Sequence, residues 1–409
     1  MEKLTNTFTM KAITRYLLFF ITIITVIFNS GYVLMMTGKY NPIYLLVAIT
    51  ILLILICFTK IKNVSIIMNY YYMSFIMLLI FMIITYVINV EFDSTFLYVN
   101  MFAVLIMSFC ISWLIEMSTF INIYIKCLKY ITIISLFFYF IENFLNIRLN
   151  FPIISTANAS YKNGIVFFQL IGLENRNTGI FWEPGLFASF LIVGMVFEIS
   201  FKKLKASYSN LFIFFIGLLT TNSTAGYMLI PLVFALFISE NFKGYHRVLL
   251  WISITFVGIT FYLFYDQLIL YLVKSNPDLF LKLINNSSNS TTRTNGPLLN
   301  IDIFKQKPFF GVGFSKATED FIKRAASWNA DSQTSTSTFY LAAMGMPGLI
   351  YSLNWIKGTL SLKNKNLLSK ITIFIIFLII INKEPHTGLV VTNCLMFFLI
   401  KDKKSSTSY

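Results

Sequence analysis

Charged residues are scarce in this chain. Asp, Glu, Lys and Arg make up 12% of its 409 positions, whereas a soluble domain carries about 25%. Hydrophobic residues make up 57% and aromatic residues 17%. This balance excludes a soluble globular protein, a disordered chain and a coiled coil. About 12 spans of ~20 residues need ~240 positions, close to the hydrophobic fraction. The composition therefore predicts an all-α polytopic membrane protein.

Histidine and cysteine are also rare, with two and four residues. His246 and His386 are predicted on opposite sides of the membrane, so they build no metal site by themselves. No cysteine is predicted on the outer side, and we expect no disulfide. The chain has no P-loop, Rossmann glycine pattern or Gly-x-Ser-x-Gly elbow. We therefore predict no metal and no cofactor.

The net charge of +15 has a simpler explanation than a nucleic-acid partner. Lys and Arg cluster at one end of successive apolar runs, as is typical of cytoplasmic loops that orient the spans. The pattern predicts a multi-pass plasma-membrane protein with both termini in the cytoplasm and membrane lipid around it.

The apolar runs predict about 12 transmembrane helices. The stretch from Leu211 to Ile238 is either one long helix or a hairpin, and the polar break from Thr220 to Gly226, with basic residues beyond both ends, favours the hairpin. The predicted spans lie at about 16–36, 42–59, 68–90, 95–115, 128–146, 179–199, 206–221, 225–239, 248–265, 337–356, 368–382 and 387–400.

Two long outer segments divide the chain. Residues 1–265 contain the first nine spans and an outer loop at about 147–178. Residues 266–336 form a large outer loop, which we expect to be a small folded subdomain because its charges nearly balance and it contains apolar stretches at 279–284 and 298–304. Residues 337–409 contain the last three spans and a cytoplasmic tail.

The densest group of polar residues lies at the outer entry of the sixth span. Arg176 stands at the predicted water boundary, and Glu183 follows seven residues later. A continuous helix places both on one face, which allows either a structural ion pair or a functional site. Pro184 and Gly185 loosen the helix beside the carboxylate, which favours a site that lines a wet cavity.

The remaining candidates lie in the second half of the chain. Arg293 stands in a polar segment, fifteen residues before the run Pro308-Phe309-Phe310-Gly311-Val312-Gly313. Gly311 and Gly313 allow a tight turn or close approach to a ligand. The run Gly345-Met346-Pro347-Gly348 lies at the middle of the tenth span, where small residues suggest close helix packing. His386 lies in a predicted outer turn, either solvated or contacting substrate.

Together these segments resemble the O-antigen polymerase and ligase superfamily of bacterial envelope polysaccharide assembly. The resemblance rests on the Arg-x-x-Gly-x-Phe run that begins at Arg176 and leads to Glu183-Pro184, on Arg293 followed by the Pro-x-x-Gly-x-Gly run, and on the large outer loop before the last spans. The Thr220–Gly226 turn is similar to a Thr/Ser-Gly segment of the family but lacks the Arg often found there. The His of ligases is also missing: counting back from Gly345 gives Thr334-Ser335. This departure favours the polymerase (Wzy-type) branch.

The resemblance implies a GT-C-like fold and a glycosyltransferase that needs no metal. Its substrates are oligosaccharide repeat units on undecaprenyl pyrophosphate, joined at the outer face into O-antigen or capsule, with a chain-length regulator protein as a possible partner. Arginine suits pyrophosphate because its planar fork binds bidentately. The expected catalytic residues are Arg176, Glu183 and Arg293, and the expected substrate-binding residues are Asn177, Gly179, Pro184, Gly311, Gly313 and His386.

Other functions stay open. A lipid-linked oligosaccharide flippase also has about 12 spans and buried charges, although transporters tend to show repeated halves and none is visible here. A ligase, an acyltransferase or another lipid-sugar transferase is a further alternative, and in the acyltransferase His386 is the catalytic candidate.

Overall fold

The computed structural model describes most of the chain. The described residues are 16–29, 31–36, 42–61, 69–147, 149–156, 159–202, 206–242, 244, 288–328, 330, 333–363 and 365–401. The predicted span at 248–265 and the apolar stretch at 279–284 lie outside them. The chain divides into two compact units, one comprising Met1–Ile80, Asp93–Tyr227 and His386–Tyr409, the other Phe81–Phe92 and Met228–Pro385.

The described residues form fourteen α-helices. Five of them are long and apolar enough to cross a membrane, which confirms a predominantly helical fold with candidate membrane spans. Helix formation satisfies every backbone polar group within the segment, as a lipid environment requires. The described residues also include one small β-sheet of three strands, which the sequence did not predict.

Most helices of the first unit coincide with predicted spans. Helix α5 begins eleven residues earlier than the predicted span at 128–146, so Lys126 and Lys129 lie within the helix and not in a loop. The helices are Tyr16–Phe28, α2 (Pro42–Ile61), α3 (Tyr70–Ile88, which continues into the second unit), α4 (Thr95–Leu114), α5 (Met117–Asn143), α6 (Pro184–Val196, followed by a π-helical turn at Phe197–Phe201), α7 (Tyr208–Thr220), α8 (Thr224–Asn241, also shared) and α17 (Val390–Ile400). The predicted polar break is confirmed, because α7 ends at Thr220 and α8 begins at Thr224.

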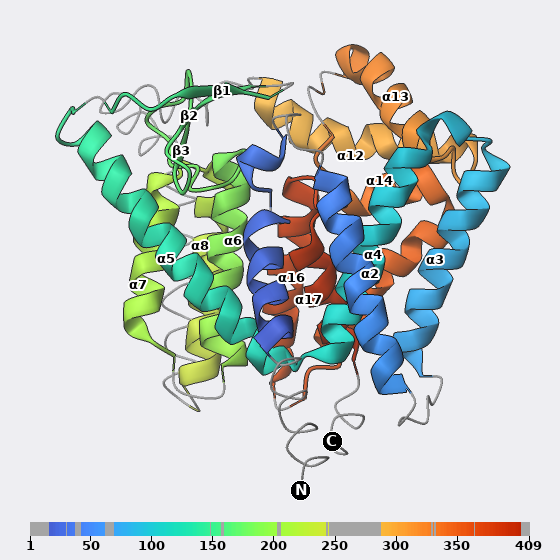
Figure 1. Ribbon diagram of the computed structural model, residues 1–409, viewed down its shortest axis with the longest axis horizontal. Helices are drawn as coiled ribbons and strands as arrows, with labels where there is room; N and C mark the ends of the chain where they lie inside the picture. The colour runs from blue at the N-terminus through green and yellow to red at the C-terminus, as the bar shows by residue number, and fades with distance from the viewer. Residues whose placement is uncertain are drawn as a thin grey trace, which may run out of the picture. The chain divides into compact units, whose positions relative to one another are not determined.

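Helix α6 is the core of its part of the first unit. Each of its thirteen residues is buried, as expected for a helix that is apolar all round. Two glycines let its neighbours approach closely: a Cβ on Gly194 would lie 2.6 Å from the Leu128 side chain of α5, and one on Gly217 of α7 would lie 2.6 Å from Thr132 of α5. Figure 1 shows α5 and α7 side by side, in agreement with their packing.

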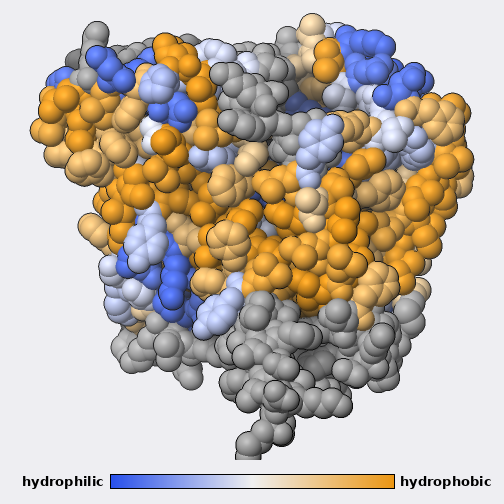
Figure 2. Space-filling model, viewed as in Figure 1, coloured by the Kyte–Doolittle hydropathy of each residue, from blue (hydrophilic) through white to orange (hydrophobic). Residues whose placement is uncertain are grey.

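The helix α4 packs against α2 and α17. The Ser108 hydroxyl of α4 lies 3.1 Å from the Val390 carbonyl oxygen of α17, and Lys401 donates to the Ser112 carbonyl at 2.7 Å, which caps the end of α4. Tyr44, Leu55 and Phe58 of α2 are exposed, and Figure 2 shows apolar side chains over the outward face of this helix. Such a surface is suited to lipid.

The segment predicted as an outer loop at about 147–178 contains an antiparallel sheet of three short strands. Strand β1 (Ile153–Ser155) pairs with β2 (Ser160–Asn163), which pairs with β3 (Phe168–Leu170). The sheet lies at the C-terminal end of α5 (Figure 1). The loop is therefore a folded platform that leads directly into Arg176.

The second unit is built around α14. Helices α12 (Ser288–Gln306) and α13 (Phe314–Ala325) come from the predicted outer subdomain, and both pack against α14 (Thr336–Met344). The predicted tenth span is broken, because Gly345 adopts φ 70° and ends α14 before a 3-10 turn (Met346–Gly348) and α15 (Leu349–Leu360) follow. Helix α16 (Leu367–Lys383) packs against α14 and α15.

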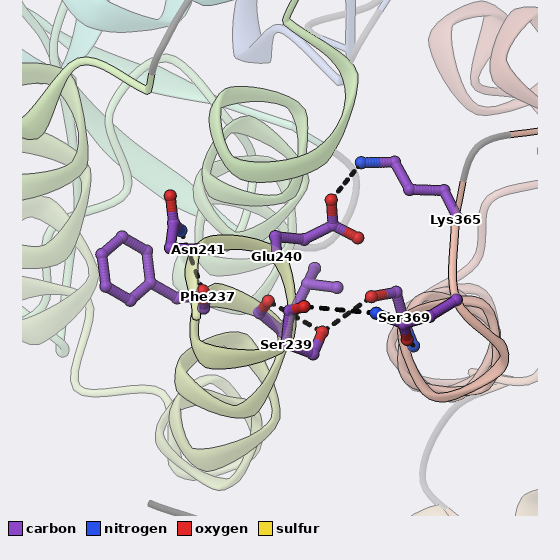
Figure 3. A network of polar contacts seen from close by, with 8 residues as sticks. Phe237, Ser239, Glu240, Asn241, Lys365 and Ser369 are labelled. Atoms are coloured by element: carbon purple, nitrogen blue, oxygen red, sulfur yellow. Dashed lines mark hydrogen bonds and ion pairs between the residues drawn. The ribbon is translucent and has the colours of Figure 1, made fainter. Parts of the chain in front are cut away.

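A polar network joins α8 to α16 within the second unit (Figure 3). The Ser239 and Ser369 hydroxyls lie 2.7 Å apart, and Asn366 donates to the Ser239 carbonyl at 3.2 Å. Lys365 forms an ion pair with Glu240, and both side chains are largely buried. The network ties the end of α8 to the start of α16.

Candidate functional site

The segment from Glu174 to Glu183 is not helical. Gly179 adopts a left-handed conformation with φ 58°, and α6 begins only at Pro184. Proline is favoured at the first helical position and forces the residue before it into extended backbone, as observed for Glu183 (φ −145°, ψ 141°). The expectation that one continuous helix places Arg176 and Glu183 on the same face is therefore wrong.

Arg176 is held by the turn between α7 and α8. Its Nε donates to the Thr221 carbonyl oxygen at 3.2 Å. In the opposite direction, the Asn222 side chain, on left-handed backbone with φ 48°, donates to the Asn175 carbonyl at 2.8 Å. The sequence singled out both segments but predicted no contact between them, because they lie 45 residues apart.

Asn177 shapes this loop from within. Its side chain is fully buried. Its amide nitrogen donates to Thr220 Oγ1 at 3.0 Å and to Ser135 Oγ at 3.2 Å, and its Oδ1 accepts from the Gly179 amide at 2.9 Å. The backbone amide of Asn177 also donates to the Thr220 carbonyl at 2.9 Å. These bonds engage both polar atoms of the Asn177 side chain and hold the loop that carries Arg176 against the end of α7.

Gly179 and Pro184 are both closely packed by their surroundings. A Cβ on Gly179 would lie 3.2 Å from the ring of Phe187, and the positive φ independently favours glycine. Pro184 is buried at the start of α6. Both residues define the path of the chain around Glu183.

Glu183 is partly exposed at the start of α6. It lies near Tyr161 of β2: burial and, secondarily, the negative charge of Glu183 raise the pKa of Tyr161 to about 12. The Tyr161 hydroxyl donates to the Trp182 carbonyl at 2.7 Å. The Trp182 amide in turn donates to the Gly31 carbonyl at 3.1 Å, so Glu183 follows a segment anchored on both sides.

The glycine-rich run of the second unit caps a helix. The amides of Val312 and Gly313 donate to the Ala342 and Ala343 carbonyls of α14, each at 3.0 Å, and the Met346 amide donates to the Pro308 carbonyl at 2.7 Å. The first two bonds satisfy carbonyls that the end of α14 leaves unpaired, and the third ties the following turn to the loop. The two glycine segments that the sequence treated separately thus form one unit.

Gly311 and Gly313 make the tight turn that the sequence predicted. Their φ angles are 69° and 96°. A Cβ on Gly311 would lie 2.1 Å from the Ala343 carbonyl oxygen, and a Cβ on Gly313 would lie 2.4 Å from the carboxyl carbon of Glu91. The close approach is therefore to other parts of the protein. Glu91 also accepts a hydrogen bond from the Lys316 amide at 2.8 Å, so its carboxylate stabilises the N-terminus of α13.

Arg293 and His386 complete the predicted set. The backbone of Arg293 lies in α12, near its N-terminal end. His386 is 1% exposed and its Nδ1 lies 2.9 Å from Thr392 Oγ1 of α17, so the expectation of a solvated turn is wrong. Of the predicted catalytic residues, Arg176 and Glu183 belong to the first unit and Arg293 to the second.

Comparison with protein-family models, curated proteins and solved structures finds no match to this chain.

Proposed function

We propose that this chain is a polysaccharide polymerase of the bacterial inner membrane, with both termini in the cytoplasm. It joins undecaprenyl-pyrophosphate-linked oligosaccharide repeat units at the outer face of that membrane. The observation that carries the proposal is the set of four hydrogen bonds that tie the Arg176 segment to the polar turn at 220–223. Two segments that were singled out separately on chemical grounds form one structured surface that presents an arginine.

The reaction needs cations for the leaving group and a base for the nucleophile. A hydroxyl of one repeat unit forms a bond to the anomeric carbon of another, while the bond from that carbon to the pyrophosphate oxygen breaks. The lipid pyrophosphate leaves with the electron pair, and the hydroxyl proton passes to a base. In this proposal Arg176 binds the pyrophosphate and Glu183 takes the proton or orients this arginine. Arg293 of the second unit is a separate candidate for binding pyrophosphate.

The bond from Arg176 Nε to the Thr221 carbonyl supports this role. It uses one edge of the guanidinium to set the plane of the group, and catalytic clamps depend on such fixed orientation. Asn177 and Asn222 hold the two sides of the contact together. A rigid arginine is suited to charge that develops on a leaving pyrophosphate.

The test is a reconstituted assay with purified protein and lipid-linked repeat units, with product length read on a gel. Wild type should give polymer, and Arg176→Ala and Arg293→Ala should give none while remaining folded. Translocation of the lipid-linked substrate across vesicles without polymer formation would instead identify a flippase, and transfer to a lipid acceptor would identify a ligase. Adding a chain-length regulator protein should change the product length and leave the reaction itself intact.

A further inference from the structure

A second polar cluster lies beside the Arg176 segment, at the end of α5 and under the sheet. Its centre is Glu142 in the last turn of α5. The Glu142 side chain is 5% exposed, yet among the described residues no group donates a hydrogen bond to either carboxylate oxygen. Its nearest charge is Lys162 of β2, whose Nζ lies 3.6 Å from Glu142 Oε1. Burying a carboxylate with so few partners is costly.

Gln169 of β3 adds a third acceptor of the same kind. It is 2% exposed, and no described residue donates to its Oε1. Gln169 stands directly opposite Lys162 in the strand register. Residues opposite each other in an antiparallel pair project from the same face of the sheet, so Gln169 and Lys162 lie on the face that Glu142 contacts.

The cluster is joined to the Arg176 segment by two hydrogen bonds. Gln169 Nε2 donates to the Glu174 carbonyl at 3.1 Å, and Tyr139, one turn before Glu142 on α5, donates to the Asn175 carbonyl at 3.0 Å. Lys162 also acts on Glu174: the Gly172 amide chiefly, and Lys162 in a smaller part, lower the pKa of that carboxyl. The cluster and Arg176 therefore belong to one continuous structure.

A contrasting carboxylate in the same unit shows what a structural role looks like. Glu198 in the π-helical turn after α6 is also fully buried. It accepts hydrogen bonds from Lys202 Nζ at 3.0 Å, from the Ser207 amide at 3.1 Å and from the Asn210 side chain. Glu198 is satisfied by the fold, whereas Glu142 and Gln169 keep three buried acceptor oxygens to which no described residue donates a hydrogen bond.

We infer that Glu142, Gln169 and Lys162 form a carbohydrate subsite that binds hydroxyl groups of the oligosaccharide next to Arg176. A carboxylate and an amide oxygen accept from adjacent sugar hydroxyls, and the ammonium donates to a sugar oxygen. The subsite deepens the polymerase proposal and rests on it for the identity of the sugar. It places the carbohydrate part of the substrate against the sheet and its pyrophosphate at Arg176.

The test uses two probes with the full-length protein in detergent: the lipid-free repeat-unit oligosaccharide and inorganic pyrophosphate. We expect Glu142→Gln to weaken oligosaccharide binding by about 10-fold or more, since hydrogen bonds to charged groups are the stronger ones. Pyrophosphate binding should stay unchanged, and so should thermal stability, because the variant removes a poorly partnered charge. Gln169→Met is the second variant and should also weaken oligosaccharide binding. Glu198→Gln is the matched control, with lower thermal stability and unchanged oligosaccharide affinity.

Three outcomes separate this inference from the polymerase proposal. Equal oligosaccharide affinity in wild type and both subsite variants overturns the subsite. Absence of oligosaccharide binding in wild type at millimolar concentration overturns it as well. Binding that depends on Glu142, in a wild-type protein that forms no polymer, retains the subsite and overturns the polymerase.

Discussion

Replacement of Asn177 by alanine distinguishes two roles for this residue, positioning of the Arg176 loop and direct binding of substrate. If Asn177 fixes the Arg176 loop, Asn177→Ala removes three side-chain hydrogen bonds, to Ser135, Thr220 and the Gly179 amide. Each such bond contributes about 0.5–1.5 kcal/mol net, and a buried donor left unsatisfied costs more. The expected loss is about 3 kcal/mol of local stability, equivalent to roughly a 100-fold increase in opening of the loop.

Hydrogen exchange of the 173–182 segment measures this loss directly. The Gly179 amide, which donates to Asn177 Oδ1 at 2.9 Å, should exchange roughly 100-fold faster in Asn177→Ala. Asn175→Ala is the matched control, because the Asn175 side chain is exposed and only its carbonyl is used in the loop. Unchanged exchange in Asn177→Ala, together with a raised KM for the lipid-linked substrate, would refute the positioning role and indicate that Asn177 binds the substrate.

Three further changes test other parts of the structure. Gly313→Ala should destabilise α13 by about 2–3 kcal/mol, because a side chain at positive φ is strained and displaces the Glu91 carboxylate that stabilises this helix. Hydrogen exchange of the α13 amides measures the loss, and unchanged protection would contradict this prediction. In the folded protein Tyr161 should stay protonated up to a pH of about 12. The stability that its burial contributes is therefore present below pH 10 and is lost as the pH rises from 10 to about 12. Glu183→Gln should lower the pKa of Tyr161, measured by phenolate absorbance with Tyr161→Phe as the reference, and an unaltered titration would show that the two groups do not interact. Lys365→Ala should lower the free energy of unfolding by about 2–3 kcal/mol, because it leaves Glu240 buried without its charge partner. The double variant with Glu240→Ala should lose less, and thermal unfolding measures both.

Most of the apolar helices could be predicted from the sequence, because long apolar runs are the pattern expected of helices that can cross a membrane; five of the described helices are long enough to do so. The break between α7 and α8 was visible in the same way, as a polar segment with a glycine. The glycine-containing run at Gly345 was visible in the sequence, but the end of α14 at that position was not predicted. Whether a glycine packs two helices or ends one depends on its neighbour, here the loop at 308–311, whose carbonyl and amide groups meet the end of α14.

The sheet was missed because its strands are only three or four residues long. A signal was present: Asn163 is the last residue of β2 and Gly164 follows it before β3, and the Asn-Gly dipeptide is a strong indicator of a hairpin. The Asn163 side chain indeed accepts from the Ile165 amide at 2.8 Å, which tightens the turn. The pairing of Arg176 with Thr221 carried no such signal, since contacts between segments far apart in the chain leave no local pattern.

The hydrogen-bond partners of each charged side chain are a better guide to a functional site than the scarcity of charged residues in the sequence. Glu183 was singled out because it follows Arg176 into the predicted sixth span and precedes Pro184 and Gly185, which loosen the helix. Glu198 and Glu142 also lie inside predicted spans but drew no attention. In the structure Glu198 has its oxygens occupied by three donors, and Glu142 has none within hydrogen-bonding distance among the described residues. An apolar side chain or a glutamine at position 142 avoids the cost of a buried charge. If the carboxylate binds substrate hydroxyls as inferred above, Glu142→Gln should therefore keep the stability of the protein and lose affinity for the oligosaccharide.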